Sequence, residues 1–340
     1  MTSARAAGGS PTAAQSSAQS SLQLRDTACS GLADDHAQRC DHQRRARSRE
    51  EDHRSEATGH ERRRGRPITT LSYVLLALLG FVVGAFGTLV GAGGGFILTP
   101  VLLILYPSLS AATITSISLV VVFFNALSGS IAYARLRRID YRSGLRFALA
   151  GIPGSVLGAL AVRSVPIRLF DAIMAAVLVA AAISVIRLKP HAERPHPSGR
   201  TVQREIVDSL GITYRYRVPL RRGTLYSAGV GFVSSFLGIG GGIVHVPLLV
   251  GLLGFPTHVA TATSHFVLVF ITGAGSATHL IGGALTVGHG LRRAIALSVG
   301  VLPGAQAGAR LSQRFSGPLI RRLLGFALLA LAVRLLLSVI

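Results

Sequence analysis

Long apolar segments alternate with short polar ones over most of the 340-residue chain. Two stretches, residues 67–134 and 223–291, contain no Asp, Glu, Lys or Arg. A bilayer core is crossed by about 20 helical residues, so each stretch is long enough for two or three passes. The pattern therefore predicts an all-α, polytopic membrane protein and excludes a soluble globular fold.

The apolar segments fall into two blocks, residues 67–187 and 224–340. Each block contains one short apolar stretch that is too brief to cross a bilayer, which is typical of a broken or re-entrant helix. The segments expected in the first block are 69–90, 94–106 (short), 111–134, 145–162 and 167–187. Those expected in the second block are 224–237, 241–253 (short), 257–281, 293–310 and 317–338.

Two polar segments lie outside these blocks. Residues 1–66 hold 9 of the 14 acidic residues and no long apolar run, so we expect a disordered, charged N-terminal tail. The basic cluster at residues 62–66 favours a cytoplasmic N-terminus. Residues 188–223 form a basic connector that we also expect in the cytoplasm, and the apolar–polar alternation at 212–218 predicts a short strand within it.

Composition supports a membrane protein of the inner (plasma) membrane. Charged residues make up 14% of the chain, against about 25% in soluble domains, and the mean hydropathy is +0.51. The net charge of +21 comes from arginines that lie mostly between apolar segments, so we expect the lipid bilayer, and not nucleic acid, as the partner. Cys29 and Cys40, with His36 and His42, lack the spacing of zinc sites, and we expect no metal and no cofactor.

The two blocks repeat one another in sequence. Residues 91–100 (GAGGGFILTP) match residues 238–247 (GIGGGIVHVP), and residues 112–116 match residues 260–264. A Leu-Arg pair and a Pro-Gly-x3-Gly segment then follow in the same order in both blocks. The matches predict two homologous repeats of about four crossings each, and such repeats are typical of transporters, which bind their substrates where the halves meet.

The arginines orient the crossings. If the tail, the connector and the cluster at 135–142 are cytoplasmic, each block crosses four times, both termini lie inside and the repeats are parallel. This arrangement leaves outside a set of arginines that would fit better inside: Arg163, Arg168, Arg310, Arg314, Arg321 and Arg322. If residues 94–106 do cross, the repeats are instead inverted and the connector lies outside.

The glycine motif is the first candidate for chemistry. Four glycines in five residues break a helix within the membrane, and the free amides at the start of the next helix favour an anion. Close helix packing is the alternative, as at Gly80 and Gly84. A dinucleotide site or P-loop is excluded because no strand precedes the motif and no Lys-Ser/Thr follows it. The candidate substrate-binding glycines are Gly91, Gly93, Gly94, Gly95, Gly238, Gly240, Gly241 and Gly242.

Polar side chains within the apolar segments are further candidates. Hydroxyls, an amide and imidazoles can donate to an oxyanion, although hydroxyls also bond back to helix carbonyls and a neutral histidine can bond to a neighbouring helix. These candidates are Thr113, Thr115, Ser116, Asn125, Thr261, Thr263, Ser264, His245 and His265. His245 is favoured because it lies three residues past the second glycine motif.

The missing residue types also discriminate between function classes. The two blocks contain only Asp140 and Asp171 as acids, so a carboxylate relay or a carboxylate cation site is not expected, and an acid-free interior favours an anion. We find no arrangement of nucleophile, base and acid, and so expect no catalytic residues and no enzyme.

Residues 67–340 resemble the TauE/SafE family of membrane permeases, often described as sulfite exporters. The doubled glycine motif, each followed by a proline (Pro100, Pro247), carries the resemblance, together with the hydroxyl clusters and the two Pro-Gly-x3-Gly segments. The resemblance implies transport of a sulfur-containing anion such as sulfite or an organosulfonate. The sequence leaves open whether protons or sodium are coupled to it. The competing class is a non-transporting membrane scaffold or partner-binding subunit that docks through the basic connector.

Overall fold

The computed structural model describes residues 70–186, 201–284 and 289–339. The predicted tail, residues 1–66, and the first part of the connector lie outside the described residues. The first block contains α2 (Thr70–Val90), α3 (Gly95–Leu105), α4 (Ala111–Arg135), α5 (Tyr141–Ala161), the 3-10 turn η1 (Val162–Ser164) and α6 (Ile167–Ile186). The second contains α7 (Leu220–Leu237), α8 (Gly242–Gly251), α9 (Thr257–Ile281), α10 (His289–Leu311) and α11 (Gly317–Val339).

Five of the described helices are long and apolar enough to cross a membrane. These five spans correspond to α2, α4, α5 together with η1, α9 and α10. The remaining helices that the sequence predicts to span, α6, α7 and α11, are not among them. Helices α3 and α8, with 11 and 10 residues, are apolar but too short to cross, as the hydropathy pattern predicts.

The described connector contains a two-stranded antiparallel sheet, so the all-α prediction needs a correction. Strand β2 (Thr213–Val218) coincides with the predicted strand, and it pairs with β1 (Val202–Val207), which the sequence analysis missed. Strand β1 was missed because its run, VQREIV, places three polar residues together and so lacks a clear alternation.

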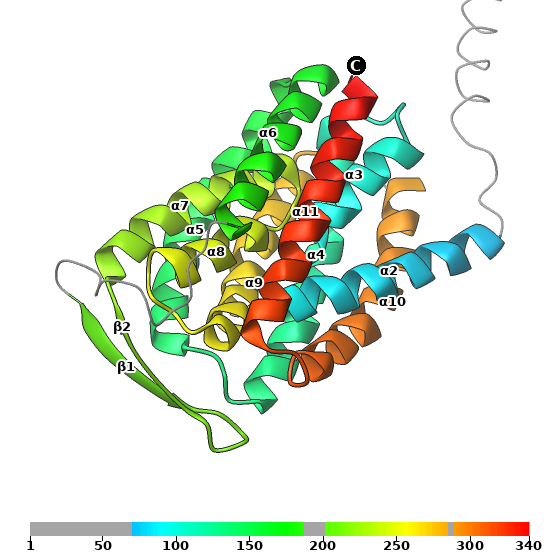
Figure 1. The fold of residues 1–340 in the computed structure, drawn as a ribbon. Coiled ribbons are helices and arrows are strands. Elements are labelled where there is room, and N and C mark those ends of the chain that lie inside the picture. The colour runs from blue at the N-terminus through cyan, green and yellow to red at the C-terminus, as the bar shows by residue number, and fades with distance from the viewer. Residues whose placement is uncertain (1–69, 187–200, 285–288, 340) are drawn as a thin grey trace, which may run out of the picture. The chain divides into compact units, whose positions relative to one another are not determined.

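The helices pack in pairs that join the two halves of the chain. Helix α2 lies along α10, α5 lies along α7, α4 packs on α9 and α6 on α11 (Figure 1). Glycines make the first two contacts close: Cβ atoms on Gly84 and Gly154 would lie about 3.0 Å from backbone atoms of Val301 in α10 and Ala228 in α7. The G-x3-G segments of α2, α5 and α10 are therefore packing surfaces within one chain.

The contacts also give the directions of these helices. Along α2, Gly80 faces Leu297 and Gly84 faces Val301, so α2 and α10 run parallel. By contrast, α4 and α9 run antiparallel, because Gly129 faces His265 whereas Gly273 faces Phe123, which precedes Gly129 in α4.

Two glycines of α7 provide a test of this packing. A Cβ on Gly231 would lie 2.9 Å from the carbonyl carbon of Gly151, whereas a Cβ on Gly229 has nothing within 4 Å. We expect Gly231→Ala to lower the free energy of unfolding by about 1–3 kcal/mol through overpacking. Gly229→Ala should leave it unchanged or raise it by up to ~1 kcal/mol. Thermal unfolding in detergent measures both, and equal melting temperatures for the two variants would contradict the α5–α7 contact.

Candidate functional site

The two glycine motifs form matching turns that pack backbone against backbone. In the first turn Gly91, Gly93 and Gly94 have φ of 85°, 77° and 80°, and in the second the corresponding glycines, Gly238, Gly240 and Gly241, have φ of 69°, 76° and 69°. A side chain is disfavoured at such φ values, which explains the repeated glycines. A Cβ on Gly95 would lie 2.7 Å from the Ile239 carbonyl, and one on Gly242 would lie 2.5 Å from the Ala92 Cα. Each turn thus contacts the start of the opposite short helix.

This contact brings together the N-termini of α3 and α8. Their first intrahelical acceptors are the carbonyls of Gly94 and Gly241, which accept from the amides three and four residues further along. The amides of the first helical residues therefore have no acceptor within their own helix. Two positive helix-dipole ends meet at this point, where a small anion would be stabilised.

Two of the predicted threonines, Thr115 and Thr261, lie beside the turns, but their hydroxyls bond within their own helices. Thr115 and Thr261, each the fifth residue of its helix, pack against Gly238 and Gly91 respectively. Their hydroxyls donate to the carbonyls one turn earlier, and the Ser116 hydroxyl donates likewise to Thr113. Thr115 and Thr261 therefore shape the turns through their backbone and methyl groups.

Thr113 and Thr263 make their hydrogen bonds away from the glycine turns. Thr113 belongs to the N-cap of α4, where its amide and hydroxyl bond to the Ser110 hydroxyl. The Thr263 hydroxyl accepts from the Asp140 amide in the α4–α5 loop, 3.0 Å away.

A buried polar cluster lies beside the first glycine turn and contains Asn125 and His265. The Thr88 hydroxyl donates to Asn125 Oδ1 at 3.0 Å, and a Cβ on Gly129, one helical turn after Asn125, would touch both Thr88 and His265. The amide nitrogen of Asn125 has no hydrogen-bond partner among the described residues, and neither ring nitrogen of His265 makes a hydrogen bond of standard geometry there. Tyr133 packs edge-on against the His265 ring and donates to the Thr88 carbonyl. The cluster therefore holds unused polar atoms within a membrane-spanning helix pair.

The structure also brings His245 and Ser264 together. The ring nitrogens of His245 lie 3.4 Å from the hydroxyls of Ser264 and Ser227, and all three residues are buried. Phe147 packs edge-on against the His245 ring. A histidine held by two hydroxyls can exchange a proton with either of them or face an anion.

Two hydroxyl residues absent from the predicted site fix the second glycine turn. Thr99 and Ser118 both donate to the Gly238 carbonyl, at 2.9 and 2.6 Å. Thr99 lies directly before the proline of the first motif, and the corresponding residue of the second motif is Val246. A hydroxyl in only one of the two repeats was the sequence signal that could have identified Thr99.

Comparison with known proteins identifies the family. A sequence model described as "Sulfite exporter TauE/SafE" matches residues 76–335, most of the chain and both glycine turns. The chain belongs to the TauE/SafE family. It is 29% identical to the probable membrane transporter protein YunE of Bacillus subtilis, over 78% of this chain and 97% of the relative. It is 31% identical to the probable membrane transporter protein ORF9 of a Sinorhizobium species, over 78% of this chain and 94% of the relative. No solved structure matches the chain.

These findings make the chain a multi-pass membrane protein of a transporter family. In this TauE/SafE protein the connector hairpin is tied to the site through the α4–α5 loop. Asp140, whose amide donates to Thr263, accepts a hydrogen bond from the Tyr216 hydroxyl at 2.9 Å and pairs with Arg204 at 3.6 Å. Burial raises the pKa of Tyr216, and the Asp140 carboxylate raises it further, so the phenol stays protonated and keeps donating.

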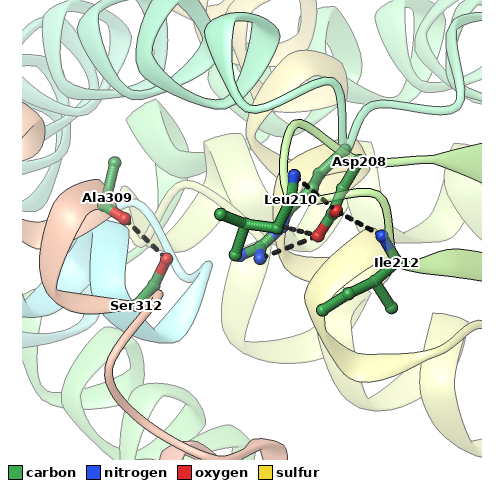
Figure 2. A network of polar contacts seen from close by, with 6 residues as sticks. Asp208, Leu210, Ile212, Ala309 and Ser312 are labelled. Carbon is green, nitrogen blue, oxygen red and sulfur yellow. Dashed lines mark hydrogen bonds and ion pairs between the residues drawn. The ribbon is translucent and has the colours of Figure 1, made fainter.

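A second, buried ion pair fixes the tip of the hairpin. Asp208 pairs with Arg138 at 3.0 Å. It also accepts from the amides of Leu210 and Ile212, as Figure 2 shows. Burial alone would raise the pKa of Asp208, but the amide of Ile212, the Arg138 guanidinium and the amide of Leu210 together lower it below the ordinary value. A carboxylate with a lowered pKa stabilises the fold above its unfolded pKa of about 3.9 and loses that effect only as the pH falls further.

The hairpin anchor can be tested with two matched carboxyl substitutions. Asp208→Asn leaves the buried Arg138 charge unpaired and should weaken docking by about 3–5 kcal/mol, so that trypsin cleaves the undocked hairpin backbone faster at its arginines. Glu205→Gln removes only the exposed pair with Arg215 and should change docking by less than ~1 kcal/mol. The wild-type digestion pattern should be the same at pH 5 and pH 8, because Asp208 stays ionised across that range. Equal trypsin sensitivity of the two variants would show that the buried pair does not hold the hairpin.

Proposed function

We propose that this TauE/SafE protein is a secondary transporter of the plasma membrane for a small sulfur-containing oxyanion or organosulfonate. The observation that carries the proposal is the meeting of two helix N-termini, those of α3 and α8, at the paired glycine turns. Such a site stabilises an anion through backbone amides and dipoles, without a charged side chain. The family description, sulfite exporter, supports the choice of a sulfur oxyanion.

The charge of the helices supports an anion over a cation. Asp171 in α6 is the one carboxylate within the described helices, since Asp140 caps α5 from outside it. A cation site in the membrane would need carboxylates or several free carbonyls close to the turns. The Gly238 carbonyl accepts from two hydroxyls, so it is not free to bind a cation.

We assign the anion to the amides of the short-helix starts, with Asn125, His265, His245 and Ser264 as side-chain donors. Asn125 has the strongest claim because its amide nitrogen is buried and has no hydrogen-bond partner among the described residues, which is costly unless a ligand or water uses it. The proposal leaves protons and sodium as the alternative coupling ions, and His245 would be the residue that carries a coupled proton.

We also propose that the two halves are inverted, in place of the parallel arrangement that the arginines favour. The antiparallel packing of α4 on α9 supports inversion. The short helices support it too, because each returns toward the start of the long helix before it. Leu253, after α8, contacts Gly223 near the start of α7. Tyr106, after α3, contacts Arg293 near the start of α10, which runs parallel to α2. In each half, the first long helix and the short helix after it (α2 with α3, α7 with α8) would then form a re-entrant hairpin, and the other three helices would cross the membrane. With three crossings in each half, the connector would lie on the side of the membrane opposite both termini.

Flux separates the transporter from the competing function, a membrane scaffold. Purified protein in proteoliposomes should take up labelled sulfite or a simple alkylsulfonate with saturable kinetics. A panel of sulfite, thiosulfate and sulfonates without saturable uptake would favour the scaffold, with the basic hairpin as its docking surface.

Asn125 offers a test that separates binding from packing. Asn125→Asp keeps the oxygen that accepts from Thr88 but replaces the unpaired amide nitrogen by a second carboxylate oxygen, which repels an anion. We expect sulfite uptake to fall at least about tenfold, the effect of losing one hydrogen bond to a charged group. The control is Thr272→Val, which removes a buried hydroxyl that bonds only to its own helix and should leave uptake within about twofold. Unchanged uptake by Asn125→Asp would remove Asn125 from the site.

Cysteine labelling tests the inverted arrangement. With Cys29 and Cys40 replaced by serine, single cysteines are placed at exposed Ser108, after α3, and exposed Leu252, after α8. The inverted arrangement puts these positions on opposite sides, so a membrane-impermeant maleimide should label only one of them in intact cells. Labelling of both, or protection of both, would restore the parallel arrangement.

A further inference from the structure

Helix α10 contains a buried arginine whose neighbour in the sequence is exposed. Arg293 is the fifth residue of α10 and its exposed fraction is 8%, whereas Arg292 is exposed. The Arg293 guanidinium lies over the ring of Tyr106, with its central carbon 3.9 Å from the ring centroid. Tyr106 directly follows α3, the short helix whose other end contacts the second glycine turn.

The positive charge of Arg293 has no acidic partner among the described residues. Its Nε has no hydrogen-bond partner there, and none of the ion pairs of the described chain involves it. The one other buried arginine of the described chain, Arg138, is paired with Asp208. A buried charge is costly unless it is paired, and an aromatic face offsets only part of that cost.

We propose that Arg293 and Tyr106 form a second anion subsite, which binds the transported oxyanion at the end of α3 that lies away from the glycine turns. The ring of Tyr106 holds one face of the guanidinium, so the edge that carries Nε is left to donate two parallel hydrogen bonds to a sulfite or sulfonate group. The first turn of α10 adds its positive dipole end. The subsite rests on the proposed anion transport.

The position of the subsite is consistent with an intermediate binding site on the path of the anion to the glycine turns. Tyr106 and the first residue of α3 lie at opposite ends of an 11-residue helix, which spans about 16 Å. An anion at Arg293 is therefore separated from one at the turns by roughly the length of α3. A lipid headgroup phosphate offers the same oxyanion chemistry at a membrane surface, and it is the other source that the experiment must distinguish.

The test compares the two neighbouring arginines in the full-length protein. Sulfite uptake is measured in proteoliposomes of phosphatidylcholine alone and of phosphatidylcholine with phosphatidylglycerol. We expect Arg293→Gln to raise the KM for sulfite about tenfold or more in both lipids, with kcat within about threefold, and Arg293→Lys to recover only part of the loss, because an ammonium lacks the planar donor pair. Arg292→Gln, at the exposed neighbouring position, should stay within about twofold of the wild type.

Several outcomes would overturn the proposal. Arg293→Gln with an unchanged KM would show that the arginine does not bind the transported anion. A KM effect confined to vesicles with phosphatidylglycerol, with loss of co-purified anionic lipid, would assign Arg293 to a lipid phosphate. If the wild type itself shows no sulfite uptake, the proposed function fails. The subsite is then judged separately, by whether sulfite raises the melting temperature of the wild type but not of Arg293→Gln, and an equal shift in both would reject it.

Discussion

The contact between the two glycine turns is the constraint on which the rest of the structure depends. Each turn requires residues with φ near +70° to +85°, and the start of each short helix lies against the backbone of the opposite turn. A Cβ at Gly95 or Gly242 would overlap that backbone, so glycine is required on both sides at once. Because the turns end α2 and α7, the following helices are short and begin at the centre of the contact. The break in the helices and the meeting of their N-termini thus have a single cause.

A centre built in this way carries positive potential and needs compensation. Carbonyl oxygens could supply it, but the Gly238 carbonyl accepts from Thr99 and Ser118, and the hydroxyls of Thr115 and Thr261 are bound to their own helices. Carboxylates could also supply it, but none lies in the helices that form the turns, α2, α3, α7 and α8. The carbonyls of Ile239 and Gly91 lie beside the starts of the opposite short helices and supply part of the compensation. The proposed anion would supply the rest, which agrees with a transporter whose site must fill and empty.

The sequence allowed the turns and the short helices to be predicted, because their signals are local: four glycines in five residues, then an apolar run too short to cross. It did not allow the side-chain partners to be predicted, because these come from distant segments. Thr88 bonds to Asn125 and Thr99 to Gly238 across 37 and 139 residues. Hydropathy indicates that α4 and α9 are buried but not that they run antiparallel, and the arginine distribution, which is shaped by the loops, favoured the parallel arrangement.

The pairing of helices between halves makes each half depend on the other. Glycine faces of α2 are covered by α10, and those of α5 by α7, so neither half buries its own close-packing surfaces. Separating the halves would expose backbone that the glycines bring into contact, which is costly in a membrane. Rearrangement during transport is therefore easier around the central turns, where φ values are unusual and Asn125 and His265 have unused polar atoms, than along the α2–α10 and α5–α7 contacts. The glycines of the long helices and those of the turns consequently do different things: the first let two helix pairs pack closely, and the second let the starts of two short helices meet, at the place to which we assign the anion.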